Sequence, residues 1–129
     1  MEQQLVMAFY GDDFTGSTDA LEFLCRAGAS TMLFIDTPTA DQLKQFPHLQ
    51  AFGVAGKTRS MSPIAMEEIL LPAFQELKKM NLKHIHYKVC STFDSSPAIG
   101  SIGKVMDLAT TVFANPCIPL LVAAPSLGR

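Results

Sequence analysis

The sequence lacks several features by which some classes of protein are recognised. It contains no tryptophan, and its three cysteines, Cys25, Cys90 and Cys117, form no Cys-x-x-Cys pair. An odd number of cysteines without that spacing argues against a disulfide framework or a zinc site. A reducing compartment fits this usage, so we expect a cytoplasmic protein whose fold depends on a hydrophobic core.

An excess of positive charge is also missing. Ten Lys and Arg residues face twelve Asp and Glu residues, which gives a net charge of −2. A chain without a basic surplus is not expected to bind nucleic acid or an anionic membrane surface. No apolar run approaches the roughly 20 residues that span a bilayer, and the polar start of the chain does not resemble a signal peptide. We therefore expect neither nucleic acid nor a membrane as a partner.

What the sequence does contain is typical of one globular domain. Hydrophobic residues make up 48% of the 129 residues and charged residues 17%, enough for a sizeable core. Apolar segments of strand length alternate with helical patterns. They predict strands at 5–10, 30–35, 50–55, 83–89 and 118–124, with Gly53 weakening the third. Helices are predicted at 15–27, 40–46, 62–80 and 96–114, with Pro116 closing the last one.

This alternation predicts an α/β fold. We expect a Rossmann-like, three-layer arrangement in which helices cover both faces of a mostly parallel sheet. The chain stops soon after its fifth predicted strand, without a helix to cover it. We therefore expect residues 1–129 to be an incomplete N-terminal domain.

Polar side chains follow four of the five predicted strands. In open parallel sheets, ligands bind outside the carboxyl ends of the strands, so these residues are predicted to share one edge. They are Asp12, Asp13 and Thr15 after the first strand, Lys57, Thr58 and Arg59 after the third, Lys88, Ser91 and Thr92 after the fourth, and Ser126 and Arg129 after the fifth.

The mixture of charges indicates the kind of ligand. Lysine and arginine suit a carboxylate, and carboxylates accept hydrogen bonds from sugar hydroxyls. A small, anionic, polyhydroxylated molecule is therefore predicted. Simpler interpretations stay open, in which the acidic turn only caps a helix and Lys57 and Arg59 are solvated loop charges. His84 and His86 alternate on one strand, where packing is a simpler role than metal binding, and any metal site is left unassigned.

Two stretches carry a family resemblance. The stretch YGDDFTGSTDALEFL, from Tyr10 to Leu24, resembles the start of the four-carbon acid sugar kinase family. The loop KVCSTFDSS, from Lys88 to Ser96, is similar to that family's K-x-D-S-T-L-R-G pattern. Lys88, Ser91 and Thr92 match this pattern, whereas Cys90 stands at the acid position and Asp94 at the arginine position. Thr58-Arg59 and the closing APSLGR also resemble family positions.

The resemblance implies a function and a division of labour. It implies the N-terminal sugar-acid-binding domain of an ATP-dependent kinase that acts on a tetronate or 3-oxo-tetronate. Asp12 and Asp13 would be catalytic, and the other residues at the edge would bind substrate. ATP and Mg²⁺ would bind mainly through a C-terminal domain absent from this sequence, and a homo-oligomer is possible.

No phosphate loop of the GxxxxGK[ST] kind occurs in the sequence. The 129 residues alone are therefore expected to be inactive as a kinase. Two alternatives from other classes stay open: a stand-alone sugar-acid-binding or regulatory module without catalysis, and a metal-dependent hydrolase that uses the aspartate pair. The departures at Cys90 and Asp94 leave the identity of the acid open.

Overall fold

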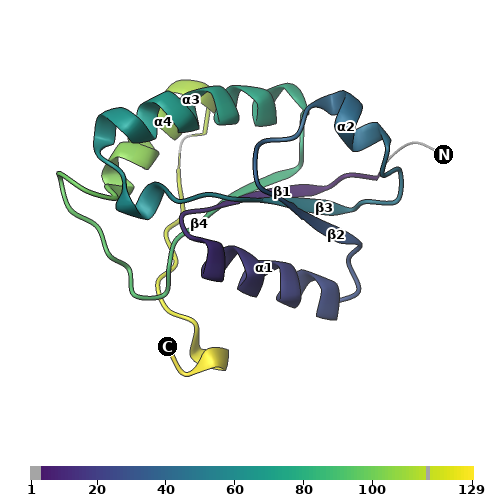
Figure 1. Ribbon diagram of the computed structural model, residues 1–129, viewed down its shortest axis with the longest axis horizontal. Coiled ribbons are helices and arrows are strands. Elements are labelled where there is room, and N and C mark those ends of the chain that lie inside the picture. The colour runs from purple at the N-terminus through teal and green to yellow at the C-terminus, as the bar shows by residue number, and fades with distance from the viewer. Residues whose placement is uncertain (1–3, 116) are drawn as a thin grey trace.

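The computed structural model describes residues 4–115 and 117–129, and it contains a four-stranded sheet in which every pairing is parallel (Figure 1). The strand order is β2-β3-β1-β4. The strands are β1 at Met7–Gly11, β2 at Thr31–Phe34, β3 at Ala51–Ala55 and β4 at His84–Lys88. An α/β fold with a parallel sheet is therefore confirmed.

The helices cover the two faces of this sheet. Helix α1 (Phe14–Arg26) lies on one face, and α2 (Ala40–Lys44), α3 (Pro63–Lys79) and α4 (Ile102–Val112) lie on the other (Figure 1). The chain leaves β1 toward α1 and leaves its neighbour β3 toward α3. These connections diverge to opposite faces, and such a switch point opens a crevice at the carboxyl ends of the two strands.

The core lies between the sheet and α3, where α4 packs alongside. All five residues of β3 are buried. Phe52 on β3 and Leu70 and Leu77 on α3 are fully buried in one hydrophobic cluster. Strands buried on both faces read as continuous apolar runs rather than alternating ones, which is why the sequence pattern located them.

Gly53 in β3 leaves room for an aromatic ring of the neighbouring strand. A Cβ atom at this position would lie 2.0 Å from Cζ of Phe9, whose ring is fully buried against the strand. Only glycine leaves room for that ring on the neighbouring strand. The sequence pattern could not indicate this packing role, because the ring lies on another strand.

The last helix begins later than predicted. It starts at Ile102, where the Ser101 side chain accepts a hydrogen bond from the Lys104 amide, and it ends at Val112. Ser96 instead closes a local turn by accepting from the Ile99 amide. Gly100 then takes a positive φ of 60° and donates its amide to the Met61 carbonyl at 2.8 Å. Pro116, expected to close this helix, lies outside the described residues.

The prediction of a fifth strand was wrong. Residues 117–129 contain no strand, and the short 3₁₀ turn η2 (Pro125–Leu127) follows. Ala123 has a φ of 87°, which no β-strand residue adopts. The Ala124 amide donates locally to the Arg129 carbonyl at 2.7 Å, and Leu121 is 85% exposed. An apolar composition therefore did not produce a strand here.

Among the described residues, no helix combines the length and the apolar character needed to cross a membrane.

Candidate functional site

Asp12 lies at the centre of the carboxyl edge of the sheet. Its amide donates to the Lys88 carbonyl at 3.0 Å, and its carbonyl accepts from the Arg59 amide at 3.1 Å. The residue is only 4% exposed, yet its Oδ1 atom has no hydrogen-bond partner among the described residues. A buried carboxylate oxygen without a donor is costly, so this atom is an acceptor that a ligand could satisfy.

The surroundings of Asp12 also favour its protonated form. Burial raises the pKa of the Asp12 carboxyl, and the charge of Asp13 adds to this effect. The Cys90 backbone amide and the positive charges of Lys88 and Arg59 oppose it without cancelling it. A carboxylate with a raised pKa is a better proton acceptor, which is the property that a general base requires.

Asp13 has a different task, because it caps helix α1. Its Oδ1 accepts from the Gly16 amide at 2.9 Å, and the Ser17 hydroxyl donates to its carbonyl at 2.6 Å. Its Oδ2 lies 3.3 Å from Nη1 of Arg59. Thr15, one residue into the first turn, is exposed. The two adjacent aspartates therefore have different surroundings, since neighbouring side chains in extended backbone point in opposite directions.

Arg59 is held by several partners at once. Besides Asp13, its Nη2 lies 2.9 Å from Oδ2 of Asp94, and its Nη1 donates to Sγ of Cys90 at 3.3 Å. Thr92 completes this cluster by donating to Asp94 at 2.7 Å. The guanidinium charge is thus shared between two carboxylates. No local pattern indicated that Cys90 and Asp94 would meet Arg59, since about thirty residues separate them.

Lys88 is the cation best placed for an anionic ligand. Its ammonium donates to the Val89 carbonyl at 3.0 Å, and no described carboxylate lies within ion-pair distance. It lies against the first turn of α1: a Cβ atom at Gly16 would approach its Nζ to 2.9 Å. An ammonium beside a helix N-terminus offers two sources of positive potential to one carboxylate.

Thr58 and Lys57 follow β3 but face different surroundings. Thr58 is fully buried in the short 3₁₀ helix η1 (Thr58–Ser60), and its hydroxyl lies 2.6 Å from the Tyr87 hydroxyl. Its side chain anchors the loop rather than facing solvent at the edge. Lys57 is exposed, and only its carbonyl has hydrogen-bond partners among the described residues.

Arg129 connects the end of the chain to this edge. Its Nη1 donates to the Ser91 hydroxyl at 3.1 Å, and its Nη2 lies 3.2 Å from Oδ2 of Asp19 on α1. Ser126 is exposed in η2. The structure thus gathers Asp12, Asp13, Arg59, Lys88 and Ser91 as predicted. Sequence reasoning missed Asp19, whose only signal was its place in the first turns of the predicted helix.

The described residues contain no group of three or more His, Cys, Asp or Glu side chains that could hold a metal ion. His84 and His86 therefore form no metal centre with described neighbours. His86 is exposed, but partial desolvation and then the positive charge of Lys88 lower the pKa of its imidazole, which favours the neutral form. Any metal ion at this edge would need most of its ligands from elsewhere.

The fold and the edge together define a class of protein. A doubly wound parallel sheet carries aspartates, a lysine at a helix N-terminus and hydroxyls at its switch point, which is typical of an α/β domain that binds a small polar molecule. Residues 7–129 match the family model described as "Sugar-binding N-terminal domain". The chain belongs to this family.

Proteins of known function show the same likeness. The chain is 42% identical over 125 residues to a 3-oxo-isoapionate kinase of Paraburkholderia graminis, covering 97% of the chain and 27% of that kinase. It is 36% identical over 118 residues to a 3-oxo-tetronate kinase of Escherichia coli K12, covering 92% of the chain and 29% of that enzyme. The chain thus spans less than a third of the length of these relatives.

A solved structure shares the fold. The crystal structure of a protein described as a putative tRNA synthase from Salmonella typhimurium LT2 superimposes with a TM-score of 0.70 at 30% identity. The match covers 88% of the chain and 28% of that protein. The likeness extends over most of the sheet and its helices.

Proposed function

We propose that the chain is the substrate-binding part of an ATP-dependent kinase that phosphorylates a four-carbon sugar acid, a tetronate or 3-oxo-tetronate. The observation that carries the proposal is the buried Oδ1 atom of Asp12, which lacks a hydrogen-bond donor among the described residues at the edge of the sheet. A ligand hydroxyl placed there would supply the donor. The kinase names of relatives that match over more than nine-tenths of the chain point to the same chemistry.

The position of the ligand carboxylate follows from the charges at the edge of the sheet. The ligand carboxylate would bind the Lys88 ammonium, because this group has no carboxylate partner among the described residues. Arg59 would act mainly by fixing Asp13 and Asp94, which already share its charge. Serine and threonine hydroxyls of the β4 loop would then contact the remaining ligand oxygens.

Asp12 is the better of the two aspartates for proton transfer. In the proposed reaction a ligand hydroxyl oxygen attacks the terminal phosphorus of ATP, the bond from that phosphorus to ADP breaks, and Asp12 accepts the hydroxyl proton. Asp13 is already engaged as a helix cap. The proposal gives Mg²⁺ no ligand set in this chain, since no described cluster suits one, and it assigns the nucleotide to the remainder of the longer protein.

The proposal can be tested by binding measurements on the 129-residue protein. Isothermal titration calorimetry should show saturable binding of a tetronate. Two matched controls should bind much more weakly: butanoate keeps the carboxylate without hydroxyls, and erythritol keeps the hydroxyls without the carboxylate. The loss of one charge-assisted hydrogen bond costs about 1.5–3 kcal/mol, or roughly 10-fold to 100-fold in affinity.

Lys88→Met should reproduce that loss for the tetronate, because it keeps the apolar stem and removes the charge. The matched control is Lys44→Met on α2, where the lysine pairs with Asp41 at the surface and away from the edge. Equal binding of butanoate and tetronate, or full affinity in Lys88→Met, would contradict the proposal. Tetronate binding by a longer protein that shows no kinase activity would instead favour a binding module without catalysis.

A further inference from the structure

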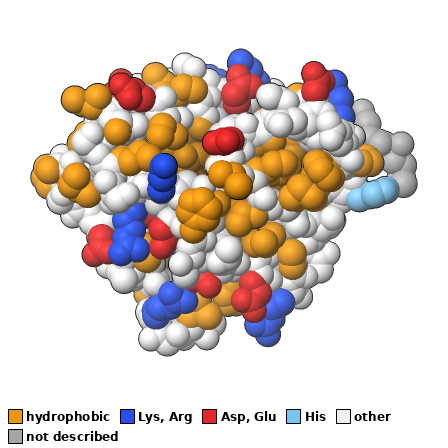
Figure 2. Space-filling model, in the orientation of Figure 1, with side chains coloured by type: hydrophobic (Ala, Val, Ile, Leu, Met, Phe, Trp, Pro, Cys, Tyr) orange, Lys and Arg blue, Asp and Glu red, His pale blue; other side chains and the backbone are white. Residues whose placement is uncertain are grey.

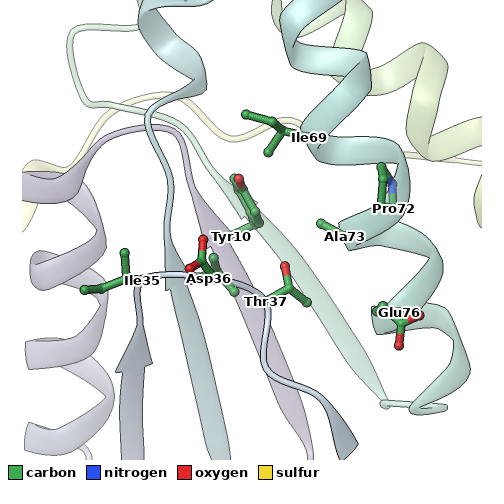
Figure 3. Close-up of a pocket in the computed structure, with 9 residues that line it drawn as sticks. Tyr10, Ile35, Asp36, Thr37, Ile69, Pro72, Ala73 and Glu76 are labelled. Atoms are coloured by element: carbon green, nitrogen blue, oxygen red, sulfur yellow. The ribbon is translucent and has the colours of Figure 1, made fainter.

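A cavity of about 220 Å³ lies on the α3 side of the sheet, near the carboxyl ends of β1, β2 and β3 (Figure 3). None of its lining residues belongs to the candidate sugar-acid site. It is bounded by the ends of β1 and β3, by the segment after β2 and by the second half of α3. Its lining residues are Tyr10, Ile35, Asp36, Thr37, Val54, Ile69, Pro72, Ala73 and Glu76.

Tyr10 forms the floor of this cavity. The residue is only 4% exposed, and its hydroxyl has no hydrogen-bond partner among residues 4–115 and 117–129. Figure 3 shows its ring standing up from β1 with the oxygen directed toward α3. The Tyr10 oxygen is not among the buried atoms that lack a partner in the described residues, so it meets solvent in the cavity, where a ligand could replace water as its hydrogen-bond partner.

The rim of the cavity is acidic. Asp36 and Glu76 carry carboxylates at its opening, and no described cation pairs with Asp36. Glu76 contacts Lys79 at 2.6 Å through Oε1, which leaves its second oxygen available. Burial raises the pKa of the Tyr10 hydroxyl, and the negative charge of Asp36 adds to this effect, so Asp36 acts electrostatically on Tyr10. The rim therefore repels anions and attracts a cation.

The walls are apolar and partly open to solvent. Ile69 is 41% exposed, and with Pro72 and Ala73 it forms a hydrocarbon surface along α3. In the space-filling view, hydrophobic side chains gather across the middle of the face shown, with an acidic group among them (Figure 2). A short alkyl chain could pack on such a wall while a charged head reaches the polar groups.

We propose that this cavity is a second ligand site and that it binds a small alkylammonium ion. The ammonium would donate hydrogen bonds to the Tyr10 oxygen and to the Asp36 carboxylate, whose charge acts on Tyr10. Glu76 would add negative charge at the opening, and the alkyl chain would lie against Ile69 and Pro72. A volume of this size accommodates a molecule of only a few heavy atoms. The inference does not depend on sugar-acid binding, because the two sites share no residue.

The test is an NMR titration of the uniformly ¹⁵N-labelled 129-residue protein with n-butylammonium chloride. Saturable shifts are expected for the amides of Tyr10, Thr37, Ala73 and Glu76, with an affinity in the millimolar range suited to so small a ligand. Two matched probes separate the contributions. n-Butanol offers the alkyl chain without the charge, ammonium chloride offers the charge without the chain, and both should bind more weakly.

Variants locate the interaction. Tyr10→Phe and Asp36→Asn should each weaken binding by roughly 3-fold to 10-fold, since each removes one hydrogen bond or charge. Asp36→Asn changes an exposed side chain, so its result does not depend on the folding of a core variant. Glu68→Gln is the control, because Glu68 lies on α3 but does not line the cavity, and this variant should bind n-butylammonium normally. Shifts that do not saturate, equal binding of n-butanol, or an unchanged affinity in both variants would overturn the proposal.

Discussion

Two adjacent aspartates differ in what they do to the stability of the domain. Asp13 caps α1 and pairs with Arg59, whereas Asp12 is buried with one oxygen unpaired among the described residues. Burial raises the pKa of Asp12, so the folded state holds this proton more tightly than the unfolded chain does. The stability that Asp12 contributes is complete below the ordinary carboxyl value of 3.8 and is lost as the pH rises through the raised value.

We therefore expect Asp12→Asn to stabilise the unliganded protein at neutral pH. Removing the buried charge should raise the melting temperature by roughly 2–6 °C, for a gain of about 1 kcal/mol. The difference should shrink as the pH falls toward 3.8, where the native carboxyl is protonated as well. Thermal melts monitored by circular dichroism across this pH range give the measurement.

Asp13→Asn is the matched control for that experiment. Asparagine still caps a helix well, but the variant loses the ion pair with Arg59, so its melting temperature should stay level or fall slightly. The same Asp12→Asn protein should bind a tetronate less tightly. A lower melting temperature for Asp12→Asn at every pH would show that the buried carboxylate stabilises the fold, which contradicts the expected cost of its unpaired oxygen.

Strand β3 depends on one small residue, Gly53. Gly53→Ala would bring a methyl group within 2.0 Å of the buried Phe9 ring on β1. Overpacking of this kind costs about 1–3 kcal/mol, so the midpoint of urea denaturation should fall. Gly103→Ala on α4 is the control, because its methyl group would meet only Ser101 Oγ at 3.7 Å and alanine favours a helix by about 0.5–1 kcal/mol.

Opposite signs for these two glycine variants are the expected result. Equal stability of Gly53→Ala and the native protein would mean that the Phe9 ring can move aside without loss. That outcome would remove the physical reason for a glycine in the middle of a buried strand.

The whole molecule is the scale at which catalysis must be judged. The chain spans 27–29% of the length of its kinase relatives from Paraburkholderia graminis and Escherichia coli, and no phosphate loop occurs in its sequence. We expect the 129-residue protein to bind a tetronate but to transfer no phosphate from ATP to it. A coupled assay for ADP release, with the 3-oxo-tetronate kinase of Escherichia coli as the positive control, measures this directly. Turnover by the 129 residues alone would overturn the assignment of the nucleotide to another part of the protein.

Much of this architecture was predictable from the sequence, and the exceptions have physical causes. Strands β1 and β3 were located because buried parallel strands are continuously apolar, and β2 and β4 were also found although their residues are only partly buried. The same reasoning failed at 118–124, where Ala123 leaves the β region and the apolar side chains stay exposed. The late start of α4 depends on Gly100 packing against the Arg59 backbone, a contact that no local pattern encodes.

The candidate site, too, was predictable from the sequence only in part. Its residues were placed at one edge because the carboxyl ends of parallel strands meet there. The sequence pattern alone could not show that Asp13 caps a helix or that the Thr58 side chain is buried. It also could not show that Cys90 and Asp94 both contact Arg59. Each of these depends on contacts between distant segments. The binding roles of these residues stay predictions.

The pairing of the two tyrosines gives the molecule a built-in optical probe. Tyr10 and Tyr87 are the only tyrosines in a chain without tryptophan, and their rings stack with centroids 6.1 Å apart and planes 6° apart. Tyr10 opens into the cavity under α3, while Tyr87 touches Thr58 beneath the polar edge. The intrinsic ultraviolet fluorescence of the chain therefore originates between the two sites, and a label-free fluorometer could follow the occupancy of either one.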